Sequence, residues 1–309
     1  MALQVVSVVC DWGAGQPGGA AGVMGWYQLA LHYKHLAWLK AEHHAVVPSD
    51  LLAQWVGISE HPYAHRIEAW AGVAEQVRAL VASLPLEKKT LFLTGDHSWA
   101  GVILQALVDR IPRLGVLWID AHADFHNPAT SPSGNLHGMP LAMATGLNTH
   151  RYHPVPEATW ELWEAQVWGG LAPSQLLMVG LRSYEPPEKD LLDAHQIPYF
   201  LAQQLHREGM QPAIEAARAL AERSDALYVS LDVDVWDPSF ARGTTSPAPA
   251  GLSIAQVRTF LEEIWDLPQT RFVEVTEINP LLDRDNQTAL YAYGTVRPFV
   301  DGEGAAGME

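Results

Sequence analysis

The feature of this sequence that most constrains its fold is an alternation of short apolar runs with longer stretches of helical period. Runs rich in Val, Ile, Leu and Phe occur at residues 5–9, 90–94, 116–119, 176–181, 227–231 and 272–275. Such runs are typical of strands that are covered on both faces. Helical stretches separate them, most clearly at residues 66–84, 212–223 and 253–265. The alternation predicts an α/β fold in which helices cover both faces of a mainly parallel sheet.

The composition supports one large folded unit. The chain has 309 residues, of which 48% are hydrophobic and 17% charged, so a sizeable core can form. We see no internal repeat and no charged linker, and we therefore expect a single domain over residues 1–309 with a frayed tail at 301–309. Two loops, 126–140 and 237–251, are rich in Pro, Gly and Ser. Loops of that length in a compact domain are usually functional.

The charge balance and the single cysteine exclude several classes of protein. Asp and Glu number 35 against 19 Lys and Arg, which gives a formal net charge of −16. Such a surface repels nucleic acid and anionic membranes, so neither is an expected partner. Cys10 is the only cysteine, which excludes an intramolecular disulfide and thiolate metal clusters. No apolar run approaches the roughly 20 residues that cross a bilayer, and the N-terminus lacks a basic start, so we expect a soluble, cytoplasmic protein.

Acidic and histidine side chains follow four of the predicted strands, at the point where each strand ends. These segments are Gly95-Asp96-His97-Ser98, Asp120-Ala121-His122-Ala123-Asp124, Asp232-Val233-Asp234 and Glu277-Ile278-Asn279. Ligands of open α/β sheets bind beyond the carboxyl ends of the strands. The pattern therefore predicts that these side chains gather at one edge of the sheet.

The spacing of these residues points to a metal site. Alternate residues of an extended chain point to one side, so Asp120, His122 and Asp124 can converge, and so can Asp232 and Asp234. With His97 they make four carboxylates and two imidazoles, and such close acids stay partly protonated unless cations lie among them. A lone Asp-x-Asp is more often a turn or a helix cap, and it is the joint occurrence of the motifs that favours ligation. Mostly oxygen ligands with some nitrogen suit Mn²⁺ better than zinc, so we expect two Mn²⁺ ions per subunit, which can activate a water molecule.

Other chemistries fit the sequence less well. The segment Gly13-Ala14-Gly15-Gln16-Pro17-Gly18 formally matches a dinucleotide-binding loop, but Pro17 and the lack of a second strand that ends in an acid argue against it. There is no Gly-x-Ser-x-Gly motif, and Cys10 has no evident base nearby in the sequence. Serine and cysteine nucleophiles are therefore disfavoured.

The motifs taken together resemble the ureohydrolase family, which includes arginase, agmatinase, formimidoylglutamase and other guanidino hydrolases. They occur in the order of the family between about residues 90 and 290, and the loop Ser133-Gly134-Asn135-Leu136-His137-Gly138 is similar to the arginase branch in particular. The resemblance implies a three-layer α/β/α arginase-like fold and a binuclear manganese centre. It also implies a small guanidino substrate and a homo-oligomer, either a trimer or a hexamer.

The resemblance also implies roles for individual residues. The implied metal ligands are His97, Asp120, His122, Asp124, Asp232 and Asp234. His137 matches the proton-carrying histidine of the family, Glu277 matches the acid that pairs with the guanidinium group, and Asp124 is expected to move a proton to the leaving amine. Ser133 and Asn135 fall on the loop that lines the substrate mouth.

Two of the positions that differ from the arginase pattern bear on the substrate. His126 stands where arginases carry Asn, and Glu185 stands where the family has Asp at the end of Gly-Leu-Arg-Asp-x-Asp. In the family these positions hold the α-carboxylate and the α-amine of arginine. A donor at His126 and an acid at Glu185 still favour an α-amino acid tail. We therefore expect kcat/KM for arginine to exceed that for agmatine by at least about tenfold.

The sequence thus predicts a manganese-dependent amidinohydrolase that cleaves arginine to urea and ornithine. Agmatine, a guanidino acid or formimidoylglutamate would require only a different substrate mouth, and these substrates stay open. A metal-binding homologue without turnover is a further alternative, against which the presence of His137 and Glu277 argues.

Overall fold

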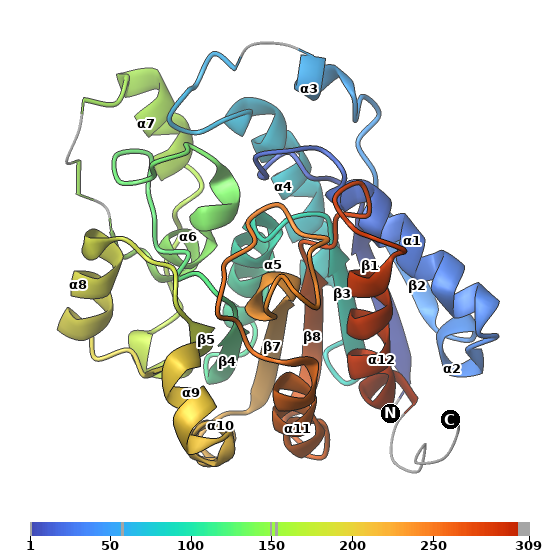
Figure 1. Ribbon diagram of the computed structural model, residues 1–309. Coiled ribbons are helices and arrows are strands. Elements are labelled where there is room, and N and C mark those ends of the chain that lie inside the picture. The colour runs from blue at the N-terminus through green and yellow to red at the C-terminus, as the bar shows by residue number, and fades with distance from the viewer. Residues whose placement is uncertain (1, 57–58, 149, 152–153, 302–309) are drawn as a thin grey trace.

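A single parallel sheet forms the centre of the molecule. The computed structural model describes residues 2–56, 59–148, 150–151 and 154–301. In chain order the strands are β1 (Leu3–Val8), β2 (Glu42–Val46), β3 (Lys89–Thr94), β4 (Leu114–Ile119), β5 (Leu176–Leu181), β6 (Tyr199–Leu201), β7 (Ala226–Asp232) and β8 (Thr270–Thr276). Across the sheet they lie in the order β2-β1-β3-β8-β7-β4-β5-β6, and every neighbouring pair is parallel (Figure 1).

Helices connect the strands. The described α-helices are α1 (Gly19–His32), α2 (Leu36–Leu39), α3 (Ala53–Val56), α4 (Ile67–Ser83), α5 (Ser98–Val108), α6 (Pro140–Thr145), α7 (Glu157–Glu164), α8 (Pro186–Ala194), α9 (Ala202–Glu208), α10 (Gln211–Glu222), α11 (Ile254–Trp265) and α12 (Gln287–Asp301). Short 3₁₀ helices are η1 (Leu136–Gly138), η2 (Pro173–Gln175) and η3 (Val233–Val235). Among the described residues, no helix combines the length and the apolar character that crossing a membrane requires.

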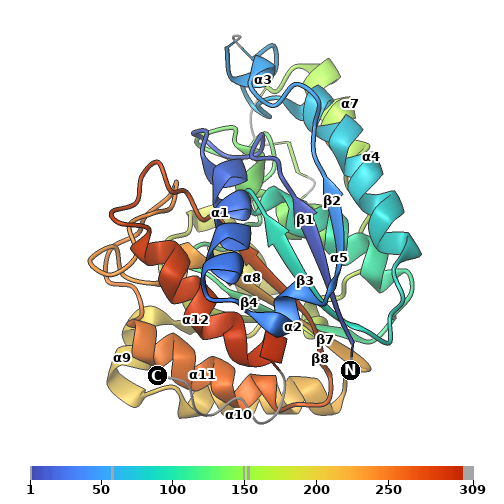
Figure 2. The same cartoon turned by 90° about the vertical axis from the view of Figure 1, so that its right-hand side faces the viewer.

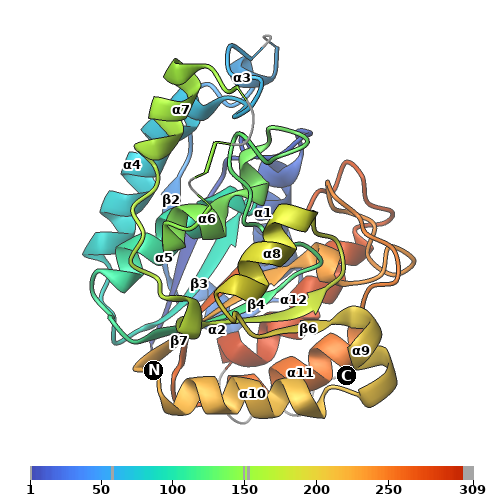
Figure 3. The same cartoon turned by 90° about the vertical axis from the view of Figure 1, so that its left-hand side faces the viewer.

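Two hydrophobic cores cover the two faces of the sheet. Successive residues of β4 belong to different cores. Trp118 belongs to the core that contains residues of α4, α5 and α6. Leu117 belongs to the core that contains residues of α1, α10, α11 and α12. Figure 2 shows the sheet between these layers, with α1, α11 and α12 on one side and α4 and α5 on the other. Figure 3 shows the same arrangement from the opposite side. The α/β fold with helices on both faces of a parallel sheet is therefore confirmed.

All six strands predicted from apolar runs are present, and each boundary lies within two residues of the prediction. The apolar pattern does not indicate β2 or β6, which are the two edge strands. Most of β2 is exposed or half-buried, and β6 has three residues that are only partly buried. An edge strand lacks a neighbour on one side and cover on its faces, so its sequence does not need the continuous apolar run of a central strand.

The expected frayed tail begins inside a helix. Asp301 is the last residue of α12, and its carboxylate contacts His35 and accepts a hydrogen bond from Arg297 Nε. Residues 302–309 lie outside the described part of the chain.

The strand order decides where the polar motifs meet. The five strands β3, β8, β7, β4 and β5 are consecutive neighbours in the sheet. Because they are all parallel, their carboxyl ends lie side by side at one edge. The segments that follow these strands are those that carry the predicted site residues.

Candidate metal centre and active site

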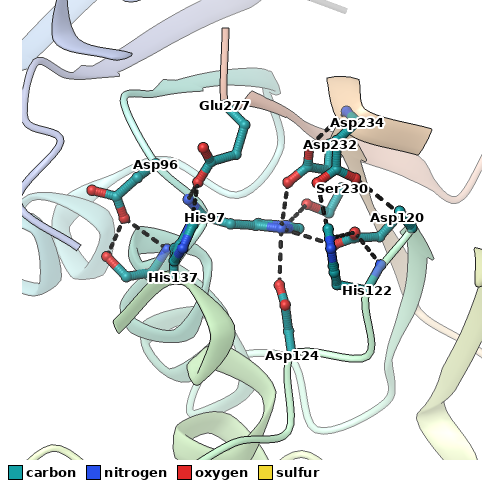
Figure 4. Close-up of polar contacts among 12 residues, drawn as sticks. Asp96, His97, Asp120, His122, Asp124, His137, Ser230, Asp232, Asp234 and Glu277 are labelled. Carbon is teal, nitrogen blue, oxygen red and sulfur yellow. Dashed lines mark hydrogen bonds and ion pairs between the residues drawn. The ribbon is translucent and has the colours of Figure 1, made fainter. Parts of the chain in front are cut away.

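His97 lies at the centre of a buried group of acids. It is the residue before α5, and 1% of its side chain is exposed. Three carboxylate oxygens surround its Nδ1 atom, Asp120 Oδ2 at 3.0 Å and Asp124 Oδ2 and Asp232 Oδ2 at 3.1 Å each. Figure 4 shows His97 between these side chains. The structure therefore brings together residues that follow β3, β4 and β7.

The donor atoms of this group are arranged as the ligands of a cation. His97 Nδ1 and Asp120 Oδ2 are buried, and neither makes a hydrogen bond within the described residues. Ligand atoms about 2.1 Å from an octahedral ion lie about 3 Å from one another, which matches the separations around His97. A histidine nitrogen and several carboxylate oxygens at this spacing suit Mn²⁺. These residues therefore fit the metal that the sequence predicts.

A second group of possible ligands lies next to the first and shares Asp120. His122 Nδ1 is 2.9 Å from Asp234 Oδ2 and 3.5 Å from Asp120 Oδ1. Asp120 thus turns one oxygen to His97 and the other to His122. Backbone amides fix two of the acids, since Ala121 N donates to Asp234 Oδ1 and Asp234 N donates to Asp232 Oδ1. The two groups therefore share Asp120, and each could hold a metal ion.

The electrostatics of this cluster show that it requires positive charge. Burial raises the pKa of Asp124 to about 7, with a further contribution from Asp120. Burial and the neighbouring Asp234 and Asp120 raise the pKa of Asp232 well above its usual range. Burial lowers the pKa of His97, but the close contacts with the carboxylates of Asp120, Asp124 and Asp232 outweigh it and raise that pKa well above its usual range. Without a metal, protons must balance the charge, and divalent cations would replace them.

Two site residues have a left-handed backbone. The φ angle is 55° at Asp124 and 64° at Glu277. Such angles are costly for residues with side chains and are concentrated at functional sites. At Asp124 the turn directs the carboxylate back toward His97 (Figure 4).

His137 and Glu277 form a second polar pair beside the metal ligands. His137 Nδ1 lies 3.0 Å from Glu277 Oε1, which also accepts a hydrogen bond from the backbone N–H of His97. The backbone N–H of His137 donates to the carbonyl oxygen of Gly13. Glu277 Oε2 is buried and has no hydrogen-bond partner among the described residues, so it is an acceptor without a donor. A planar cation such as guanidinium can supply that donor.

A cavity of about 200 Å³ connects the metal ligands with the expected substrate mouth. The residues that line it are His97, His122, Asp124, His126, Ser131, Pro132, Ser133, His137, Gly138, Ser183, Glu185, Glu188, Asp232, Asp234 and Ser246. The structure thus places His126, Ser133 and Glu185 on the wall, as expected for substrate-binding residues. Asn135 and Glu277 are not among the lining residues. A Cβ atom on Gly15 would lie 2.8 Å from Asn135 Nδ2, so this side chain packs against the N-terminal glycine loop.

His126 and Glu185, which both line the cavity, contact each other. His126 Nε2 lies 2.8 Å from Glu185 Oε2 and 3.3 Å from Glu188 Oε2. Burial lowers the pKa of His126, although Glu185 opposes that effect. Burial also raises the pKa of Glu188 well above its usual range. A neutral imidazole therefore donates to Glu185 at the place where the substrate tail is expected.

The sequence patterns did not indicate two of the acids around the site. Glu188 lines the cavity and its carboxylate accepts from the backbone N–H groups of Glu185 and Phe125. Glu185 and Glu188 form a capping box at the start of α8, and the Glu-Pro-Pro-Glu sequence is the signal for it. Glu274 lies inside a predicted strand and is fully buried. An acid within an apolar strand is itself a signal, because charged residues are almost never fully buried without partners.

Comparison with known proteins adds to this geometry. A family model described as "Arginase family" matches residues 2–300. The chain belongs to the arginase family. The family consists of hydrolases that act on guanidino and amidino groups.

Individual relatives of this arginase-family protein agree with the match. The arginase of Bacillus caldovelox is 35% identical over 206 residues, which is 65% of each chain. The solved structure of an arginase from Bacillus caldovelox has a TM-score of 0.82 at 28% identity and covers 98% of this chain and 99% of that one. The formimidoylglutamase of Bacillus subtilis has a TM-score of 0.73 at 18% identity, with 99% and 88% covered, which is a likeness of fold. The sequence alignments to the first curated relatives span slightly less than two thirds of their lengths.

Proposed function

We propose that this arginase-family protein is a manganese-dependent amidinohydrolase that cleaves L-arginine to urea and ornithine. The observation that carries the proposal is the buried His97 Nδ1, which faces three carboxylate oxygens without a hydrogen bond. The adjoining group of His122 and Asp234 shares Asp120 with it. This donor set lies at one end of a cavity of small-molecule size.

Two ions would be held by two overlapping groups of residues. His97, Asp124 and Asp232 would bind one ion, His122 and Asp234 the other, and Asp120 would contact both. Bound divalent cations supply Lewis acidity, which lowers the pKa of water and stabilises negative charge at the reacting carbon.

The remaining site residues would bind the substrate and move protons. Glu277 Oε2 would accept hydrogen bonds from the guanidinium group and hold its plane. Water adds to the guanidinium carbon, the bond from that carbon to the substrate nitrogen breaks, and a proton must reach the leaving amine. Asp124 would carry that proton, because its carboxylate lies on the cavity wall and its pKa is raised. His137, with 14% of its side chain exposed, would exchange protons with solvent.

The far end of the cavity would bind the α-amino acid tail. Glu185 and Glu188 provide acids for an ammonium group, and the hydroxyls of Ser131, Ser133 and Ser183 provide donors for a carboxylate. Arginine has both groups and uses both sets of partners. Unpaired polar groups reject an analogue that lacks one of them.

Agmatine is the second candidate, and a specific contact favours it. His126 Nε2 is paired with Glu185, so the donor expected for a carboxylate is already occupied. Agmatine has the ammonium group and lacks the carboxylate. It would therefore use the two acids without needing His126.

Urea release from a panel of substrates by the manganese-loaded protein tests the proposal. The panel contains arginine, agmatine and 4-guanidinobutyrate, with formamide release from formimidoylglutamate measured in parallel. We expect arginine to be the best substrate and to exceed agmatine at least about tenfold in kcat/KM. A faster rate with agmatine would move the assignment to agmatinase. No turnover of any compound would support a metal-binding protein without catalysis.

Three further features belong to the same proposal. The chain would form a single domain over residues 1–309, would assemble as a trimer or hexamer, and would act in the cytoplasm. Size measurement in solution tests the assembly.

A further inference from the structure

A buried polar chain lies behind His97, on the side away from the metal ligands. His97 Nε2 is 2.8 Å from Ser230 Oγ, and Ser230 Oγ donates to Glu274 Oε2 at 2.7 Å. Tyr228 OH donates to the same oxygen at 2.8 Å, and Thr94 Oγ1 donates to Glu274 Oε1 at 2.8 Å. Glu274 has no exposed surface. The chain joins residues of β3, β7 and β8, which are neighbours in the sheet.

The direction of the hydrogen bonds in this chain follows from the Ser230 hydroxyl, which has a single proton. The Ser230 O–H donates to Glu274 Oε2. The Ser230 oxygen then offers a lone pair to His97, and the His97 Nε2 must carry the proton that donates to it. In the neutral form that can bind a metal, the imidazole carries its single proton on Nε2 and has a lone pair at Nδ1. That lone pair faces Asp120, Asp124 and Asp232 (Figure 4).

The ring of His97 is fixed in a second way. It stacks on Trp118 with a centroid distance of 4.0 Å and an interplanar angle of 5°. The stack sets the plane of the ring, and the Ser230 contact sets its rotation within that plane. Both are needed to direct Nδ1 at a metal ion.

We propose that Glu274 is a positioning residue of the metal centre, which acts through Ser230 to hold His97 as an Nδ1 metal ligand. The proposal rests on the proposed function, since it assumes that a metal binds at His97. It assigns a role to a buried acid that does not line the cavity. Glu274 Oε2 lies 3.8 Å from His97 Nε2, too far for a hydrogen bond, and Ser230 bridges the two.

Metal binding to four purified variants tests the proposal without measuring activity. Ser230→Ala and Glu274→Gln interrupt the chain, and Tyr228→Phe is the matched control. Tyr228 donates to the same Glu274 oxygen as Ser230, but it does not link Glu274 to His97. The fourth variant, Ser230→Thr, restores a hydroxyl. Calorimetric titration of the metal-free proteins with Mn²⁺ gives the affinity for each ion, and their thermal unfolding midpoints give the general loss of stability.

We expect Ser230→Ala and Glu274→Gln to weaken the binding of one of the two ions by about 10–100-fold. Tyr228→Phe should lower the unfolding midpoint to a similar extent but change Mn²⁺ affinity less than about threefold, and Ser230→Thr should recover most of the affinity. The proposal is overturned if Ser230→Ala binds both ions as tightly as the wild type, or if Tyr228→Phe loses as much affinity. If Glu274→Gln does not fold, Ser230→Ala still decides, because it removes only a hydroxyl.

The same titration separates this proposal from the proposed function. A wild type that binds two ions but releases no urea contradicts the proposed reaction and leaves the comparison among variants valid. A wild type that binds no ion overturns both.

Discussion

Two buried atoms without partners, His97 Nδ1 and Glu277 Oε2, define the chemistry of the site at the scale of single residues. A buried polar atom that lacks a hydrogen bond typically costs about 1–3 kcal/mol. When such atoms lie in the wall of a cavity or beside a cavity, they can bind a ligand. The first atom fits a cation and the second fits the donors of a planar substrate group.

The roles of His137 and of the metal ligands can be separated by one substitution. We expect His137→Ala to retain both Mn²⁺ ions and to lower kcat by about 10²–10⁴-fold, because a proton carrier accelerates the reaction to this extent but binds no metal. Metal content per chain and steady-state urea release measure the two effects. Asp124→Asn is the contrasting variant and should lose metal and activity together. An unchanged kcat in His137→Ala between pH 7 and 9 would show that this histidine only supports the loop.

The pKa of His137 depends on its acidic partner. Burial lowers the pKa of His137, but Glu277 outweighs it and raises the pKa above its usual value. We therefore expect Glu277→Gln to lower this pKa, because burial is then less strongly opposed. Histidine ¹³C chemical shifts of the metal-free protein across pH 5–9 measure it, with His137→Ala used to assign the signal. A pKa that stays at its wild-type value in Glu277→Gln would mean that other charges control His137.

At the scale of elements, two of the three glycines in helix α1 have opposite surroundings. A Cβ atom on Gly22 would lie 1.9 Å from the carbonyl oxygen of Ile278, the residue after Glu277, whereas a Cβ atom on Gly25 would meet nothing within 4 Å. The helix therefore packs directly against the backbone of the loop that holds Glu277. The absence of a side chain at Gly22 makes that contact possible.

Alanine at these two glycines should have opposite effects. Gly25→Ala should stabilise the protein by about 0.5–1 kcal/mol, because alanine favours a helix over glycine. Gly22→Ala should destabilise it and lower kcat/KM for a guanidino substrate, because the loop that carries Glu277 must move. Urea unfolding and steady-state kinetics on both variants measure this. Equal activity of the two variants would contradict the proposed coupling between α1 and Glu277.

The sequence predicts the central strands well because of a contrast that also marks the candidate ligands. Buried strands such as β4 must be apolar on both faces, and the acids that follow them stand out against that pattern. Edge strands lack this contrast, and so does Glu188, which lies in the first turn of α8. Whether His126 reaches the substrate or Glu185 depends on side-chain geometry across the cavity, which residue spacing does not encode.

At the scale of the whole molecule, metal binding and stability should be linked through pH. The pKa values of Asp124 and Asp232 are raised in the folded metal-free protein, so these two groups bind more protons there than in the unfolded chain between about pH 4 and 7. The pKa of His97 is also raised, and its contribution is lost as pH rises through that higher value. All three effects make the metal-free protein lose stability as pH rises. Metal binding releases these protons and is therefore favoured at high pH.

We expect Mn²⁺ to stabilise the protein more at pH 8 than at pH 6. At a free concentration of about 100 times Kd, each bound ion adds about 2.7 kcal/mol to the free energy of unfolding. Thermal unfolding with Mn²⁺ and with a chelator at both pH values measures the difference, and elemental analysis should find two ions per chain. A stabilisation that shrinks as pH rises would contradict the link, and one ion per chain would contradict the two-ion centre.

The position of the ligands in the sheet also has a consequence for the time course of folding. His97 and Asp120 follow β3 and β4, Asp232 ends β7, and β8, which comes last in the chain, lies between β3 and β7 in the sheet. The complete ligand set exists only after β3, β8, β7 and β4 have all associated, which is a late event for contacts so distant in sequence. Manganese should therefore leave the refolding rate almost unchanged and slow the unfolding rate. The ion then stabilises the finished fold kinetically and does not help the chain to form it.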